Sequence, residues 1–135
     1  MDSLYREVIL EHYKQPHHQG QLADPTVSVE VDNPLCGDRL RIDLALQDGV
    51  VTDMAFTGRG CAISQAAASI LSDDLIGRPV AEVATLTWRD MMELLGVEIG
   101  PARLKCALLG LRGVKMALAQ AGVPITSYTD TDETE

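Results

Sequence analysis

Residues 40–57 read LRIDLALQDGVVTDMAFT, and this stretch decides the fold class. Apolar residues alternate with other residues from Leu40 to Leu46, which is the period of a strand with one buried face. Asp48-Gly49 is a strong signal for a two-residue hairpin turn, so we expect residues 50–57 to return as a second strand. The pair predicts an antiparallel sheet.

A third strand and several helices complete the expected fold. Residues 26–32 alternate in the same way, with Val27, Val29 and Val31 on one face. An N-terminal helix is expected to end before Pro16. Further helices are expected over residues 61–75, 80–84, 87–95 and 102–120. The sequence thus predicts an α+β fold, a three-stranded antiparallel sheet with an N-terminal helix and C-terminal helices packed on it.

Length and composition favour one ordinary globular domain. The chain has 135 residues, of which 46% are hydrophobic and 23% charged. We expect a single domain over residues 1–125 and an acidic, disordered tail over residues 126–135. A net charge of −9 argues against nucleic acid or an anionic membrane as partner. Because the sequence has neither a membrane-spanning apolar run nor a secretory signal pattern, we expect a cytoplasmic protein.

Three cysteines stand out, because their number is odd and none lies in a C-x-x-C pair. Cys36 is expected in the turn between the first two strands, and Cys61 at the start of a helix. On the last helix, Leu104, Leu108, Leu111 and Leu118 form the expected core stripe, and Cys106 lies away from it. From spacing alone, two interpretations stay open: three unrelated thiols, or one composite site assembled by the fold.

A composite site would have a definite chemistry. Three thiolates leave one position of a tetrahedral metal site, and Asp38, two residues after Cys36, is a candidate to fill it. Thiolate ligands suit either Zn²⁺ or an iron–sulfur cluster, and composition does not choose between them.

Four segments carry a resemblance to a known family. They are LYREVILEHYK at 4–14, NPLCGD at 33–38, GRGCAISQA at 58–66 and PARLKCA at 101–107. Together they resemble the U-type iron–sulfur cluster assembly proteins (IscU, SufU and the N-terminal domain of NifU) over residues 3–121. The resemblance implies a SufE/IscU-like fold, with Cys36, Cys61 and Cys106 as cluster or zinc ligands and as thiols able to carry persulfide sulfur. Cys106 is the first candidate for the persulfide, and Asp38 would be the fourth, weaker ligand.

The resemblance also implies a function and partners. It implies a scaffold that accepts persulfide sulfur from a cysteine desulfurase of the IscS or SufS type. The scaffold would build a transient [2Fe–2S] cluster and pass it to apo-proteins. The alternative is a zinc-dependent sulfurtransferase of the SufU kind that relays persulfide from a SufS-type desulfurase. A zinc-stabilised adaptor without sulfur chemistry is the third possibility.

The subfamily signals are mixed. Lys105 stands where Isc-type members carry a histidine before the third cysteine, which makes this motif SufU-like. The 44 residues between Cys61 and Cys106 leave no room for the insertion typical of SufU proteins. Lys105 and Arg59 are either solvated or positive charges that favour a neighbouring thiolate, and Arg59 could also pair with Asp38.

The remaining candidates are interpreted as structural. We expect His12 to be a packing or surface histidine rather than a metal ligand. His17 and His18 are expected to be solvated, and they could also coordinate a metal adventitiously. Gly58-x-Gly60 is a weak phosphate-loop signal, because the lysine and serine of a P-loop are missing.

Overall fold

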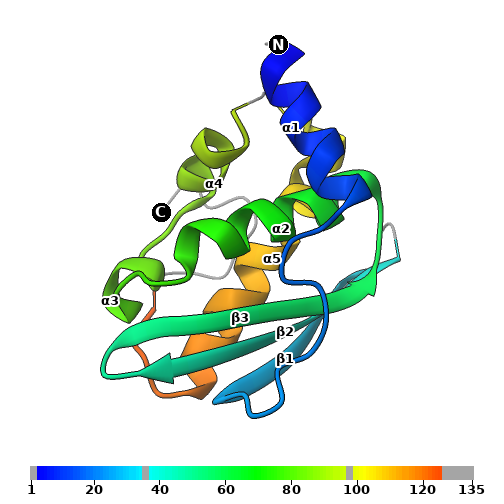
Figure 1. Ribbon diagram of the computed structural model, residues 1–135. Helices are drawn as coiled ribbons and strands as arrows, with labels where there is room; N and C mark the ends of the chain where they lie inside the picture. The colour runs from blue at the N-terminus through cyan, green and yellow to red at the C-terminus, as the bar shows by residue number, and fades with distance from the viewer. Residues whose placement is uncertain (1–2, 35–36, 97–98, 126–135) are drawn as a thin grey trace.

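The computed structural model describes residues 3–34, 37–96 and 99–125. Figure 1 shows a three-stranded sheet and the helices that pack on it. The strands are β1 (Val27–Asn33), β2 (Asp38–Gln47) and β3 (Val50–Arg59). The helices are α1 (Ser3–Lys14), α2 (Ala62–Leu75), α3 (Val80–Val83), α4 (Trp88–Leu95) and α5 (Pro101–Gln120). The predicted α+β class and strand pairing are confirmed. The predicted tail, 126–135, lies outside the described residues.

The sheet has the order β1-β2-β3 with both pairs antiparallel. The hairpin between β2 and β3 turns at Asp48 and Gly49, whose φ values of 55° and 76° are those that a two-residue turn of type I′ needs. A register shift at Ala45/Leu46 interrupts the β2–β3 ladder just before this turn.

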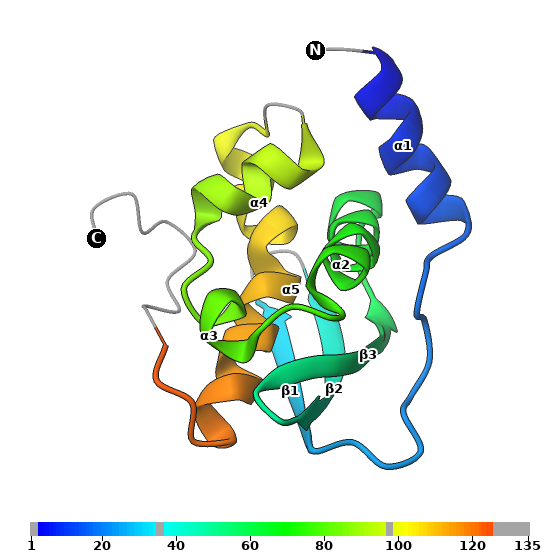
Figure 2. The ribbon, with the colours of Figure 1, turned by 60° about the vertical axis from the view of Figure 1, so that its left-hand side comes forward.

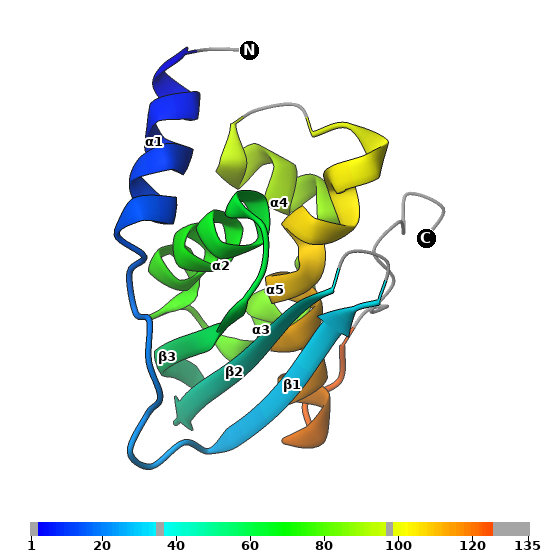
Figure 3. The same cartoon turned by 90° about the vertical axis from the view of Figure 1, so that its right-hand side faces the viewer.

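One face of the sheet forms the floor of the core. Leu40, Ile42 and Leu44 of β2 are completely buried, as the alternation predicted. The helices lie on this side of the sheet, with α5 in contact with β1 and β2, and α2 in contact with β3 (Figure 3). The sheet therefore depends on α2 and α5 to remove its apolar face from water.

On the opposite face of β2, where the alternation places the residues between the apolar ones, Asp43 is not open to solvent. Asp43 is 1% exposed, because the segment that leads into β1 crosses over it. Its carboxylate accepts hydrogen bonds from the Ser28 hydroxyl (2.7 Å), the Arg41 guanidinium (2.9 Å) and the Leu22 amide (3.0 Å). Burial raises the pKa of Asp43, but these hydrogen bonds outweigh it and hold the pKa below its usual value.

Helix α5 is buried on more than one side, which corrects the expectation that Cys106 lies off the core. The helix packs against the sheet on one side and against α2 on another, so a single leucine stripe does not describe its buried surface (Figure 2). A β-carbon on Gly110 would meet Ala68 of α2 at 3.4 Å, and one on Gly113 would meet Ile42 of β2 at 2.8 Å. Cys106 is 5% exposed and belongs to this enclosed part of the helix.

The end of β3 also differs from the prediction. The returning strand was expected over residues 50–57, but Gly58 and Arg59 continue it and pair with β2. Gly58 has φ of 145°, and a β-carbon there would lie 2.1 Å from the Arg39 carbonyl oxygen. The close approach of two backbones explains this glycine without any role in phosphate binding.

The outer helices are fixed by local signals. Thr87 and Asp90 form a complete capping box at the start of α4, and Gly96 ends that helix with a left-handed backbone. Helix α1 packs against α2 on the side away from α4 (Figure 2). Within the described ranges, no helix combines the length and apolar character that crossing a bilayer requires.

Candidate metal centre

Asp38 and Cys61 meet where β2 begins and α2 begins. The Cys61 amide donates a hydrogen bond to Asp38 Oδ1 at 3.1 Å, and Cys61 Sγ lies 3.6 Å from Oδ2. Cys61 is the N-cap residue of α2, so its sulfur lies at the positive end of the helix dipole. Asp38 is 3% exposed and Cys61 is half-buried. The pair thus presents a carboxylate and a more accessible thiol side by side.

Gly60 makes this approach possible. A β-carbon at Gly60 would lie 2.3 Å from Ser64 Oγ and 3.0 Å from Asp38 Cγ, so an alanine would collide with both groups. Ser64 is fully buried one turn into α2, and its hydroxyl donates to the Cys61 carbonyl at 3.1 Å. The same hydroxyl oxygen lies 3.9 Å from Cys61 Sγ. Ser64 was missed as a site residue, because a serine after a helix start is common for local reasons alone.

Cys106 completes the cluster from a distant part of the chain. One ligand atom from each of Asp38, Cys61 and Cys106 lies within 4.8 Å of the other two. These atoms come from the start of β2, the cap of α2 and the second turn of α5. The packing of α5 against both α2 and the sheet brings the third residue to the first two.

The donor set fits a thiophilic metal. In a tetrahedral zinc site with Zn–S near 2.3 Å and Zn–O near 2.0–2.2 Å, a sulfur and an oxygen ligand lie ~3.5 Å apart. The 3.6 Å between Cys61 Sγ and Asp38 Oδ2 already matches this spacing. The remaining separations, up to 4.8 Å, require a modest closing movement. Two sulfurs and a carboxylate oxygen suit Zn²⁺ or iron better than Mg²⁺ or Ca²⁺.

Cys36, the third predicted sulfur ligand, lies outside the described residues. The described residues nearest to it are Pro34, which follows β1, and Gly37, which precedes β2. The four-ligand set Cys36, Asp38, Cys61 and Cys106 therefore remains a prediction, of which the last three residues lie together.

The charged residues near the cysteines are open to solvent. Arg59 and Lys105 are both exposed, so each remains either a solvated side chain or a source of positive charge. His12 is buried rather than at the surface, and it shares a 2.6 Å hydrogen bond with the Ser69 hydroxyl. His17 and His18 are exposed but not simply solvated, because both lie against Asp73.

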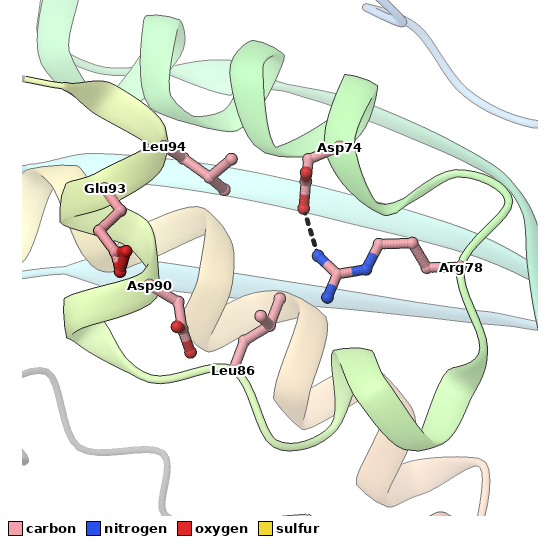
Figure 4. Close-up of a pocket in the computed structure, with 6 residues that line it drawn as sticks. All are labelled: Asp74, Arg78, Leu86, Asp90, Glu93 and Leu94. Atoms are coloured by element: carbon pink, nitrogen blue, oxygen red, sulfur yellow. Dashed lines mark hydrogen bonds and ion pairs between the residues drawn. The ribbon is translucent and has the colours of Figure 1, made fainter.

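A pocket between α2 and α4 carries carboxylates but none of the predicted ligands. It is lined by Asp74, Arg78, Leu86, Asp90, Glu93 and Leu94 (Figure 4). Asp74 pairs with Arg78, and Asp90 belongs to the cap of α4. These two acids are therefore engaged in holding the helices, which sets the pocket apart from the cysteine cluster.

The family comparison decides what the cluster belongs to. The model of the NifU-like N-terminal domain matches residues 4–122. This chain is a member of the NifU-like N-terminal domain family. The match includes all three cysteines and Asp38, and so takes in the cluster described above.

Relatives of this NifU-like domain carry both of the names that the resemblance suggested. The zinc-dependent sulfurtransferase SufU of Bacillus subtilis is 36% identical, over 89% of this chain and 92% of that protein. The iron–sulfur cluster assembly scaffold protein IscU of Thermotoga maritima is 33% identical, over 90% and 96%. The crystal structure of a NifU-like N-terminal protein from Brucella abortus superposes with a TM-score of 0.74. It is 27% identical, over 90% of this chain and 96% of that one.

Proposed function

We propose that this chain is a scaffold that accepts persulfide sulfur from a cysteine desulfurase, assembles a transient [2Fe–2S] cluster and passes it to apo-proteins. One observation carries the proposal. Asp38, Cys61 and Cys106 belong to three different parts of the fold, yet one ligand atom of each lies within 4.8 Å of the other two. Scaffold relatives of similar length support it. Cys36 is proposed as the third sulfur ligand.

Sulfur would arrive by thiol–persulfide exchange. A thiolate of this chain attacks the terminal sulfur of the desulfurase persulfide, the new S–S bond forms, and the desulfurase cysteine leaves as a thiolate. No net oxidation occurs in this step. Cys61 is the more accessible of the two described thiols, whereas Cys106, our first candidate for the persulfide, is buried and needs local opening at the start of α5.

Cluster formation then needs iron and electrons. Each sulfane sulfur takes up two electrons to become bridging sulfide, so a dithiol or another two-electron reductant must be supplied. The cluster is cargo, and a carboxylate corner helps its release, because oxygen binds a thiophilic iron centre less firmly than thiolate does. In this proposal Asp38 both positions Cys61 and marks the corner from which the cluster leaves.

A second function, zinc-dependent sulfur transfer, is favoured by a separate observation. The 3.6 Å between Cys61 Sγ and Asp38 Oδ2 suits a tetrahedral zinc site, and Lys105 stands where an Isc-type histidine would be. In that case Cys36, Asp38, Cys61 and Cys106 would hold Zn²⁺. The metal would keep the thiols together and deprotonated until one is released to accept sulfur.

Anaerobic reconstitution separates the two functions. The full chain is incubated with iron, cysteine, a reductant and a cysteine desulfurase, and visible absorption is followed on the protein fraction. The scaffold proposal expects a protein-bound cluster in the native chain and little or none in Cys61→Ser or Cys106→Ser. Sulfur transfer without any bound cluster, together with stoichiometric zinc in the purified chain, would establish the zinc-dependent function instead.

A further inference from the structure

A second group of metal-ligating side chains lies where α1 meets α2, remote from the cysteines. His12 of α1, His17 of the following segment and Asp73 of α2 each offer one ligand atom, and these atoms lie within 4.8 Å of one another. Along α2, Asp73 is twelve residues from Cys61, which corresponds to ~18 Å of helix. The two groups therefore do not form one site.

The contacts within this group are close. His17 Nδ1 lies 2.5 Å from Asp73 Oδ2, and the rings of His12 and His17 have their centroids 4.4 Å apart. His18 Nδ1 lies 3.7 Å from the other oxygen of Asp73. Two imidazole nitrogens and a carboxylate oxygen are a ligand set that transition metals such as Zn²⁺, Co²⁺ and Ni²⁺ prefer.

Ser69 supplies the support that a metal-binding histidine normally has. Its buried hydroxyl lies 2.6 Å from His12 Nδ1 and accepts the backbone N–H of His17 at 2.7 Å. A hydroxyl oxygen has two lone pairs, so it can accept from His12 Nδ1–H as well, which leaves His12 Nε2 for a metal. Both metal-ligating histidines would then be oriented by one residue of α2.

The group combines a buried ligand with open access. His12 is 8% exposed, while the side chains of His17 and Asp73 are 44% and 41% exposed, so an ion can enter from solvent.

We propose that His12, His17 and Asp73 form a second, sulfur-free site for a divalent transition-metal ion, which fastens α1 to α2. The ion takes the place of the proton between His17 Nδ1 and Asp73 Oδ2, whose distance would open from 2.5 Å to the ~3.3 Å that separates two ligands of a tetrahedral ion. Water fills the remaining position. This site is independent of the proposed scaffold function, because it contains none of the cysteines.

Calorimetric titration with Ni²⁺ alone tests the site on the full chain. The native chain should bind one more equivalent of Ni²⁺ than either His17→Ala or Asp73→Asn. Both variants can keep the hydrogen bond from the backbone N–H of residue 17 to Ser69, so they remove a ligand without removing this contact. Asp74→Asn is the matched control, since Asp74 is the next residue on α2 and pairs with Arg78 instead. It should keep the native stoichiometry. Equal stoichiometry in the native chain, His17→Ala and Asp73→Asn would overturn the site.

Hydrogen exchange tests the second half of the proposal. Addition of Ni²⁺ should slow amide exchange in residues 3–14 of the native chain by about tenfold or more, and should leave that exchange unchanged in His17→Ala. The same slowing in both chains, or binding of the extra ion with no slowing in the native chain, would contradict the fastening of α1.

Discussion

The Asp38 carboxylate uses both of its oxygens on Cys61, with Oδ1 accepting the backbone amide at 3.1 Å and Oδ2 lying 3.6 Å from the sulfur. One side chain thereby fixes the start of α2 and stands next to the thiol that the start of α2 presents. The Asp38→Asn substitution separates these two roles. An asparagine can still accept the hydrogen bond from the Cys61 amide, but it is a poorer metal ligand than a carboxylate.

Substitution of Asp38 should slow cluster release. If Asp38 is the labile corner, Asp38→Ala should retain a reconstituted cluster longer against transfer to an apo-ferredoxin, with a transfer rate lowered by about tenfold. Asp38→Asn should behave in the same way with a smaller loss of stability. The rate is followed by circular dichroism of the two proteins. Faster loss of the cluster from both variants would mean that Asp38 only supports the structure.

Gly60→Ala should damage the site more than the fold. The added methyl group collides with Ser64 Oγ and the Asp38 carboxylate, so the carboxylate must move away from Cys61. We expect a loss of about 1–3 kcal/mol in the free energy of unfolding and weaker metal binding, measured by urea titration and zinc calorimetry. Gly100→Ala is the control, because that position has open space around it. Equal zinc affinity in Gly60→Ala and the native chain would contradict the described geometry.

Two glycines of α5 test the packing that carries Cys106. Gly113→Ala places a methyl group 2.8 Å from Ile42 and should lower the free energy of unfolding by about 1–3 kcal/mol. Gly110→Ala meets Ala68 at an ordinary 3.4 Å and should be neutral or stabilise by up to ~1 kcal/mol through helix propensity. Thermal unfolding of both variants checks the pair. A less stable Gly110→Ala than Gly113→Ala would show that α5 packs differently against α2 and the sheet.

Asp43 should make the fold sensitive to acid. Its pKa is lowered in the folded chain, so its contribution to stability is fully present above its unfolded value of about 3.9. That contribution is lost as the pH falls through the lower, folded pKa. Asp43→Asn should therefore lower stability at pH 7 and flatten the loss of stability below about pH 4. Urea titrations between pH 7 and 2.5 measure this, and an unchanged slope in the variant would refute it.

The sheet could be predicted from sequence because its signals are local. The alternation from Leu40 and the turn at Asp48-Gly49 each act over a few neighbours, and each appears where it was expected. The capping box at Thr87 acts over the same short range and starts a helix that was expected over residues 87–95. The burial of Asp43 depends on a segment some twenty residues earlier in the chain, so no local pattern could reveal it. The enclosure of Cys106 likewise depends on α5 touching two layers at once.

The candidate site shows the same division. Cys61 at a helix start was visible from the glycines before it, and Asp38 from its place beside Cys36. From the spacing of the cysteines alone, the convergence of Asp38, Cys61 and Cys106 on one site was only one of two open interpretations. The group of His12, His17 and Asp73 could not be predicted as a unit, because residues 56 apart in the chain meet there.

The coordination of one bound zinc ion per chain tests the central claim most directly. X-ray absorption at the zinc edge should give a shell of three sulfurs near 2.3 Å and one oxygen near 2.0–2.2 Å in the native chain. One sulfur should be lost in each of Cys36→Ser, Cys61→Ser and Cys106→Ser, and none in Asp38→Ala. A shell made mainly of nitrogen and oxygen, or a sulfur count that Cys61→Ser and Cys106→Ser leave unchanged, would contradict the assembly of these residues into one metal centre.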